Sequence, residues 1–186
     1  VNNRLAPVSL KPRAVLAEWD AATGRLTLVC GNQSAPTLRD TMAGIMGVEP
    51  AQMRVVTPQV GGGFGSKSPA YPEYAPLLHA ARVLGRPVRW RATRTEAFLS
   101  DIHGRDSVIE GALALDAEGR FQALDLRVVA GLGPFTVGAG LIVATFNTKY
   151  CLAGLYDPPA IHLSTRLVFT NTVPTGPYRG AGRPEA

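Results

Sequence analysis

The chain has 186 residues and a formal net charge of +5; 46% of its residues are hydrophobic and 18% are charged. This length and composition exclude a disordered chain. The sequence contains no run of about 18 apolar residues, so no membrane-spanning helix is predicted. The two cysteines are too few for a four-cysteine zinc site or a disulfide framework. The basic residues are scattered, and their densest stretch contains few aromatic side chains, so we expect no nucleic-acid partner and no membrane partner.

The N-terminus, Val-Asn-Asn-Arg-Leu, has neither an initiator Met nor an apolar signal segment. Without such a segment, secretion is not indicated, and we expect a cytoplasmic location. We also expect the chain to be a piece of a longer polypeptide.

The first part of the chain predicts a hairpin followed by a strand–helix–strand unit. Strands are expected over residues 14–19, 25–30 and 53–57 because apolar and β-favouring residues alternate there. Apolar residues at helical spacing predict a helix over 36–46, which Ser34 would cap and Gly47 would end.

The second part predicts two further helices, another hairpin and a final strand. Helices are expected over residues 71–84 and 93–99, and strands over 87–91, 107–115, 121–130 and 161–170. Residues 131–149 are rich in glycine and carry no clear pattern. Together these elements predict an α+β fold with a mixed β-sheet, hairpins and two main helices, forming a single domain over residues 1–186.

A glycine-rich loop, Val60-Gly-Gly-Gly-Phe-Gly-Ser-Lys67, lies between a predicted strand and a predicted helix. Glycines allow backbone N–H groups to approach a ligand, and the following helix N-terminus favours an anion. The loop departs from the Walker pattern at Ser66, where that pattern has glycine. One hypothesis is therefore a non-catalytic α+β module that binds a nucleotide or another anion at the Gly61–Lys67 loop.

Two other segments could carry chemistry. The segment Tyr178-Arg-Gly-Ala-Gly-Arg-Pro184 exposes backbone beside two arginines that could hold an anion. Gln33 follows a predicted strand and precedes a predicted helix, which is a position where ligands collect in α/β sheets.

Taken in order, Gln33, Gly-Gly-Gly-Phe-Gly-Ser-Lys at 61–67 and Pro-Tyr-Arg-Gly-Ala-Gly-Arg-Pro-Glu-Ala at 177–186 resemble the molybdenum-binding large subunit of the xanthine oxidase and aldehyde oxidoreductase family. Phrases such as Phe169-Thr-Asn-Thr-Val-Pro-Thr175 resemble its carbon monoxide dehydrogenase-like bacterial branch. The resemblance extends over essentially the whole chain. It implies the N-terminal part of a molybdopterin-binding domain.

The resemblance implies a molybdenum hydroxylase that inserts water-derived oxygen into an aldehyde or heterocycle carbon. The cofactor-binding residues that it implies are Gln33, Gly62, Gly63, Phe64, Gly65, Arg179 and Gly180. In the family, Gln33 would donate a hydrogen bond to an oxo ligand of molybdenum, and no side chain of this chain would bind the metal directly. Molybdopterin is expected in its cytosine dinucleotide form, with iron–sulfur clusters and FAD on partner subunits or domains, and a homodimer is a further expectation.

Departures from the family pattern narrow the expected activity. The family's general base is a Glu far downstream and is not Glu185, so these residues alone are expected to be inactive. Gly180 stands where carbon monoxide dehydrogenases carry a cysteine, which argues against carbon monoxide as substrate. Ser68 and Asn147 stand where purine-oxidising members carry an acidic residue and an arginine, which argues against xanthine. Ala181 replaces a substrate-stacking Phe, and an aldehyde-like or other small substrate remains.

Overall fold

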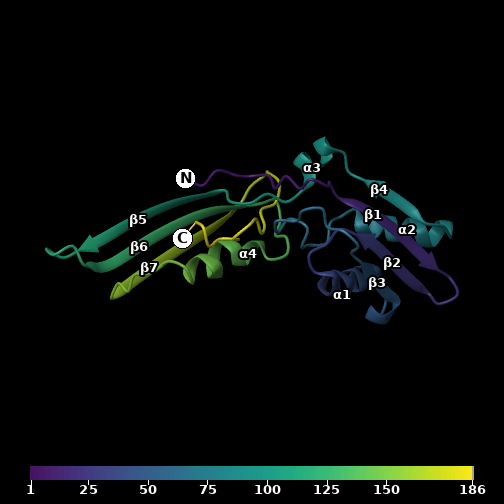
Figure 1. Ribbon diagram of the computed structural model, residues 1–186, viewed down its shortest axis with the longest axis horizontal. Helices are drawn as coiled ribbons and strands as arrows, with labels where there is room; N and C mark the ends of the chain where they lie inside the picture. Colours follow the sequence, from purple (N-terminus) through teal and green to yellow (C-terminus); the bar gives the residue numbers. More distant parts are fainter. Residues whose placement is uncertain (186) are drawn as a thin grey trace. The chain divides into compact units, whose positions relative to one another are not determined.

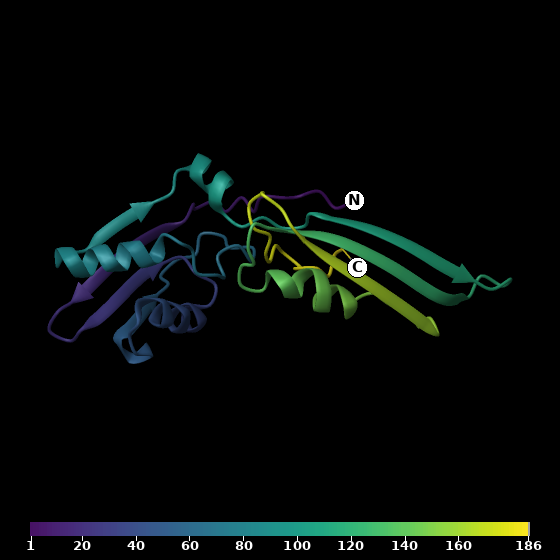
Figure 2. The same ribbon diagram turned by 180° about the vertical axis from the view of Figure 1, so that it is seen from behind.

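The computed structural model describes residues 1–185 and divides the chain into two compact units, each traced in Figure 1 and, from behind, in Figure 2. The glycine-loop unit is Val8–Asp101. The long-sheet unit combines Val1–Pro7 with the residues from Ile102 onward. Each unit is described by itself below. The prediction that residues 1–186 form one domain stays a prediction.

The glycine-loop unit contains a four-stranded mixed sheet in the order β3-β2-β1-β4. Its strands are β1 (Ala14–Asp20), β2 (Arg25–Cys30), β3 (Met53–Val56) and β4 (Val88–Arg91). The neighbours β1 and β2 form the predicted antiparallel hairpin, whereas β2 and β3 are parallel and are joined through helix α1 (Ala35–Met46). This is the predicted strand–helix–strand unit.

Two helices cover this sheet and close its core. Helix α1 packs against β3, α2 (Tyr74–Leu84) packs against β1, and the two helices contact each other. Alternate residues of β1 and β2 are buried with the inner faces of the helices: Val15, Ala17, Leu26, Leu28, Cys30, Leu38, Met42, Tyr74 and Leu78. The period-two pattern of the strands and the period-3.6 pattern of the helices therefore produce one apolar layer.

The helix ends mostly follow local signals. Helix α1 ends at Gly47 in the left-handed region, with φ of 65°, as predicted. Helix α3 (Arg94–Ser100) begins with the predicted capping box between Thr93 and Glu96. Ser34 occupies the predicted N-cap position of α1, but its side chain makes no capping hydrogen bond to the backbone, and its hydroxyl pairs with Thr37 Oγ1 at 2.7 Å instead.

The boundaries of two other predicted elements shift. Helix α2 begins at Tyr74 rather than at residue 71, and Pro72 explains this because a residue before proline is disfavoured in helical geometry. A short 3₁₀ helix, η1 (Pro50–Gln52), precedes β3.

The long-sheet unit contains three long strands in the order β5-β6-β7. They are β5 (Ser107–Leu115), β6 (Phe121–Gly133) and β7 (Ala160–Phe169), with β5 antiparallel and β7 parallel to β6. The unassigned segment 131–149 completes β6 and then forms a helix, α4 (Gly140–Ile142), which continues as a π-helical segment, η2 (Val143–Asn147). Segment η2 packs against β7.

The two units bury their apolar side chains unequally. In the long-sheet unit, Val128, Ala130 and Leu132 on β6 are buried, whereas many large apolar side chains are exposed: Leu113, Leu115, Phe135, Phe146, Tyr150, Leu155, Tyr156, Ile161 and Phe169.

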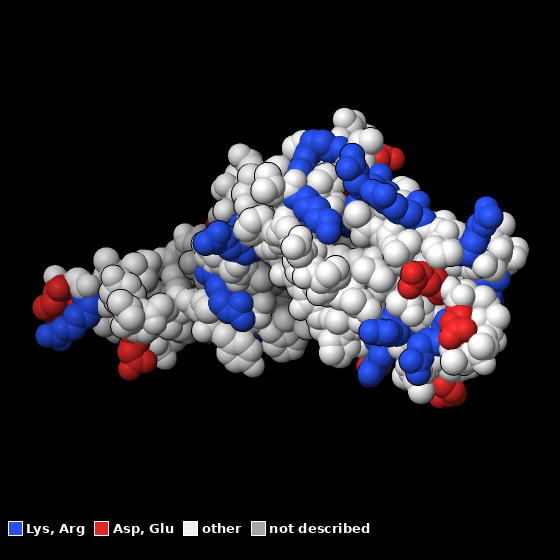
Figure 3. All heavy atoms as spheres, turned by 45° about the vertical axis from the view of Figure 1, so that its right-hand side comes forward, with Lys and Arg blue, Asp and Glu red and all other residues white. Residues whose placement is uncertain are grey.

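Figure 3 shows the Lys and Arg side chains in several groups, with acidic side chains between some of them. No helix within residues 1–185 is long and apolar enough to cross a membrane. The predicted α+β class, with two main helices and hairpins, is confirmed.

Candidate cofactor-binding site

The segment after β2 is tied to the end of the glycine loop by backbone and side-chain hydrogen bonds. Asn32 is buried, and its Nδ2 donates to Lys67 O at 2.7 Å while its Oδ1 accepts from Ser34 N at 2.6 Å. The backbone N–H of Gln33 also donates to Lys67 O, at 3.1 Å. The start of α1 and the glycine loop therefore hold each other in place.

The side chain of Gln33 lies against this loop in one defined orientation. Its Oε1 accepts from Gly65 N at 2.9 Å and from Lys67 N at 3.2 Å. An amide oxygen that accepts two backbone N–H groups fixes which end of the amide faces the loop. The nitrogen Nε2, a donor of two hydrogens, is therefore the end of the amide that these two N–H groups do not bind.

The close approach of the Gln33 side chain explains why residue 63 is a glycine. A Cβ at Gly63 would lie 2.5 Å from Gln33 Cδ and Oε1, so any side chain there would displace Gln33. In contrast, Phe64 retains a side chain, which is 41% exposed, although its φ is 51°. A non-glycine residue at positive φ is uncommon and persists where the surroundings hold it.

The turn at Gly62, Gly63 and Phe64 carries unused donors. Within residues 1–185 their three backbone N–H groups have no hydrogen-bond acceptor, whereas Gly65, Ser66, Lys67 and Ser68 all donate. Together with Gln33 Nε2, the turn thus presents a set of hydrogen-bond donors to a ligand. This donor set fits a group rich in acceptor atoms.

The loop lysine has a structural role. Lys67 is 2% exposed, and its Nζ donates to Lys11 O and to Val60 O, both at 2.7 Å. Burial, and then the positive charge of Lys11, lowers the pKa of Lys67 to about 8. Because two of its hydrogens are donated to carbonyls inside the protein, the Lys67 ammonium joins the loop to Lys11 and Val60.

Tyr71 and Arg13 make further contacts that support the loop. The hydroxyl of Tyr71 donates to Ser66 O at 2.7 Å, and the Arg13 guanidinium lies over the Tyr71 ring at 3.6 Å from its centroid. Arg13 is buried and pairs with Asp101 at 2.6 Å and with Glu73. This network connects the loop, through Arg13, to the residue before α2 and to the residue after α3 in the same unit.

Arg179 and Gly180 lie in a second loop, Tyr178–Arg183, in the long-sheet unit. It is a tight turn in which Ala181 N donates to Tyr178 O at 2.9 Å and Arg183 N donates to Gly180 O at 3.2 Å. Gly180 and Gly182 have φ of 92° and 93°. A Cβ at Gly182 would lie 1.8 Å from Val143 O, so the loop packs directly on η2.

Three side chains that the sequence analysis did not assign to this role hold the second loop. Asn147 Nδ2 donates to Ala181 O at 2.7 Å, and Thr148 Oγ1 donates to Gly182 O at 3.1 Å. Arg105 donates to the carbonyls of Tyr178 and Arg179. The positive φ of Arg105, 66°, is a tertiary feature without a sequence signal.

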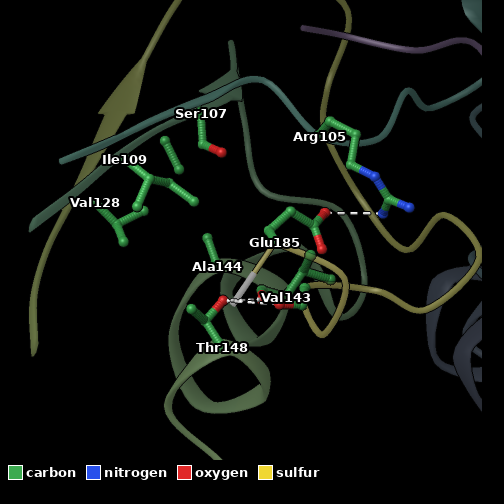
Figure 4. Close-up of a pocket in the computed structure, with 10 residues that line it drawn as sticks. Arg105, Ser107, Ile109, Val128, Val143, Ala144, Thr148 and Glu185 are labelled. Carbon is green, nitrogen blue, oxygen red and sulfur yellow. Dashed lines mark hydrogen bonds and ion pairs between the residues drawn. The ribbon is translucent and has the colours of Figure 1, made fainter. Parts of the chain in front are cut away.

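A small pocket lies beside this loop, between the inner face of the sheet and η2 (Figure 4). Ile109, Val128 and Val143 contribute apolar walls, and Arg105 and Glu185 form an ion pair at its rim, with 2.8 Å between Nη1 and Oε1. Within residues 1–185, Glu185 Oε2 is buried without a hydrogen-bond partner. No group of three or more His, Cys, Asp or Glu side chains in these residues could hold a metal ion.

The structure thus places the predicted residues in two groups. Gln33 and the turn 62–65 are in contact in the glycine-loop unit, whereas Arg179 and Gly180 belong to the long-sheet unit. A site formed jointly by both groups stays a prediction. The sequence analysis did not assign structural roles to Asn32 and to the buried Lys67.

Comparison with known proteins places the chain in a family. A family model described as "Molybdopterin cofactor-binding domain" matches residues 1–186. The chain is 33% identical over 173 residues to the carbon monoxide dehydrogenase large chain of Hydrogenophaga pseudoflava, covering 93% of this chain and 22% of that one. It is also 33% identical over 186 residues to the 6-hydroxypseudooxynicotine dehydrogenase complex subunit gamma of Paenarthrobacter nicotinovorans, covering 100% and 23%.

Solved structures give the same result. Quinoline 2-oxidoreductase from Pseudomonas putida 86 superposes with a TM-score of 0.87 at 31% identity, covering 98% of this chain and 24% of that one. Aldehyde oxidoreductase from Desulfovibrio gigas shares the fold, with a TM-score of 0.87 at 24% identity, covering 100% and 20%. The chain therefore spans about a fifth to a quarter of the length of these relatives.

Proposed function

Because this chain belongs to the molybdopterin cofactor-binding domain family, we propose that it supplies part of the molybdopterin site of a larger molybdenum hydroxylase subunit. The observation that carries the proposal is the orientation of Gln33. Its Oε1 is held by the N–H groups of Gly65 and Lys67, so Nε2 is left as a donor for a ligand.

The donor set fits the cofactor. The molybdenum cofactor would present acceptors and negative charge through the dithiolene of molybdopterin and the oxo ligand of the metal, and the turn at Gly62, Gly63 and Phe64 offers three backbone N–H groups beside Gln33. Because glycine carries no side chain, a bulky planar group can approach this backbone closely. In this proposal, Arg179 and Gly180 contribute from the second loop.

When bound, the molybdenum cofactor would supply the transfer of a water-derived oxygen to an aldehyde or N-heterocycle carbon, with removal of electrons from that carbon. The residues of this chain would bind and orient the cofactor. Gln33 Nε2 would donate to an acceptor of the cofactor, and the Phe64 ring, 41% exposed, would cover one side of the site. Lys67 would keep the loop in place through Lys11 O and Val60 O.

The general base and the electron acceptors lie outside these residues in this proposal. Iron–sulfur clusters and FAD would sit on other subunits or domains, and the cytosine dinucleotide form of the cofactor is proposed. The exposed apolar side chains of the long-sheet unit support burial against further protein, since monomeric proteins rarely expose large apolar patches. A homodimer and a cytoplasmic location complete the proposal.

The substrate is proposed to be a small aldehyde or heterocycle. Gly180 stands where carbon monoxide dehydrogenases carry a cysteine, which argues against carbon monoxide oxidation. Asn147 uses its amide to hold Ala181 O and so provides no positive charge for a purine.

The rival hypothesis, an anion-binding module without catalysis, is not supported. That hypothesis was based on the backbone N–H groups of the glycine loop and on the following helix N-terminus, whereas the lysine that ends the loop is 2% exposed and is bonded to two carbonyls. A nucleotide phosphate would therefore meet backbone N–H groups, while the Lys67 ammonium stays bonded to Lys11 O and Val60 O.

The test is metal analysis and pterin fluorescence on the full-length folded subunit purified from its own host. We expect molybdenum and pterin in equal amounts, close to one per subunit. The 186-residue chain alone is expected to show no hydroxylase turnover. Folded full-length protein that contains neither molybdenum nor pterin would contradict the proposed function.

A further inference from the structure

Arg105 is held in an unusual backbone conformation next to the second loop. Its φ is 66° and that of Asp106 is 71°, although neither residue is glycine. Two consecutive residues in the left-handed region are costly and persist where the surroundings enforce them. Here Asp106 pairs with Arg4, and its carbonyl accepts from Gly131 N at 2.9 Å.

This conformation aims the Arg105 guanidinium at the backbone of the loop. Nη1 donates to Tyr178 O and Nη2 donates to Arg179 O, both at 2.9 Å. The same guanidinium lies over the Tyr178 ring at 5.1 Å from its centroid. A planar fork with fixed donor directions holds two adjacent carbonyls in one geometry, which a lysine ammonium does not reproduce.

Glu185 forms an ion pair with the same guanidinium. Its Oε1 lies 2.8 Å from Arg105 Nη1, and the two side chains are 7% and 13% exposed. Figure 4 shows the carboxylate and the guanidinium facing each other across the rim of the pocket. Because Glu185 Oε2 has no partner within residues 1–185, Arg105 is the cation that neutralises this buried carboxylate.

We propose that Arg105 and Glu185 form a clamp that sets the backbone of the Tyr178–Arg183 loop, and that both are positioning residues for the cofactor. Arg105 bonds the first two carbonyls of the loop, and Glu185 returns from just beyond its last residue to the same guanidinium. The loop is thereby fixed at both ends by one side chain. The role toward the cofactor rests on the proposed function, whereas the clamp itself does not.

The test uses hydrogen exchange on the full-length subunit, with and without cofactor, and the rate of cofactor loss on dilution. Arg105→Lys keeps the charge opposite Glu185 but removes the fork. We expect exchange of the Ala181 and Arg183 amides, and loss of cofactor, to become about tenfold faster, as the loss of one or two hydrogen bonds implies. The matched control is Arg127→Lys on β6, whose exposed side chain pairs with Asp125 at 3.7 Å and should change neither rate.

A second variant keeps the test decisive if Arg105→Lys fails to fold. Glu185→Gln preserves the side-chain volume and an oxygen acceptor, and it should accelerate the same amides to a smaller extent. Unchanged exchange at residues 178–183 in both variants, or acceleration spread evenly over the subunit, would overturn the clamp. Wild-type protein without molybdopterin would contradict the proposed function, and the exchange comparison would still decide the clamp.

Discussion

Gln33 Oε1 accepts a hydrogen bond from the backbone N–H of Gly65 at 2.9 Å, although the two residues are 32 positions apart in the chain. This contact determines the orientation of the whole amide and so determines what Gln33 offers to a ligand. The first two predictions test this contact, one by changing Gln33 and the other by changing the loop.

Gln33→Glu keeps an oxygen for the Gly65 and Lys67 amides but removes both Nε2 donors. It also places a negative charge beside an anionic cofactor. Because hydrogen bonds to charged groups contribute about 1.5–3 kcal/mol, we expect at least roughly tenfold weaker cofactor retention. The measurement is molybdenum and pterin content of the full-length protein after dialysis. Gln59→Glu, an exposed glutamine at the start of the loop, is the control and should retain cofactor as the wild type does.

Gly63→Ala tests the same contact sterically. The new Cβ would lie 2.5 Å from Gln33 Cδ, so the Gln33 side chain must move and its bonds to the loop must break. We expect reduced cofactor content with a folded protein. Gly44→Ala in α1 is the control, because its Cβ meets no atom within 4 Å. It should raise the free energy of unfolding by about 0.5–1 kcal/mol, and equal cofactor content in the two variants would disprove the steric account.

The stability of the chain should depend on pH through Lys67. Its pKa is lowered from 10.5 to about 8 by burial and by the charge of Lys11. Between these values the unfolded chain binds more protons, so the free energy of unfolding rises with pH. The buried thiol of Cys30, with its pKa raised from 9.0 to about 11 by burial, acts in the opposite sense above pH 9.0. The effect of Lys67 is therefore clearest between about pH 8 and pH 9.

Urea unfolding at both ends of this interval measures the effect. The wild type should gain stability with rising pH, and Lys67→Met should lose that gain while also leaving Lys11 O and Val60 O without their donor. The same pH slope in both proteins would mean that Lys67 titrates as it does in water.

Arg13→Met should be strongly destabilising. It leaves Asp101, whose side chain is 6% exposed, and Glu73 without their cation, and breaking a buried pair typically costs about 3–5 kcal/mol. Arg39→Met removes an exposed pair with Asp40 and should cost less than about 1 kcal/mol. Urea unfolding of both variants compares them directly, and similar losses would show that burial does not control the strength of the Arg13 network.

The sequence was sufficient wherever structure depends on near neighbours. Alternation predicted β1, β2, β5 and β6, helical spacing predicted α1 and α2, and Thr93 with Glu96 predicted the start of α3. The sequence did not predict that the Ser34 hydroxyl pairs with Thr37. It also gave no pattern for the glycine-rich segment 131–149, which contains a helical segment that packs against β7.

The candidate site divides in the same way. Glycines at 61–65 and 180–182 indicate by themselves that backbone must be exposed, because glycine is the residue that close approach and positive φ require. Only the tertiary structure decided that Gln33 presents its nitrogen, that Lys67 is enclosed by two carbonyls, and that Arg105 holds carbonyls 73 and 74 residues away. The physical reason is that the direction of a donor is set by the partners of its side chain, and here those partners are distant in sequence.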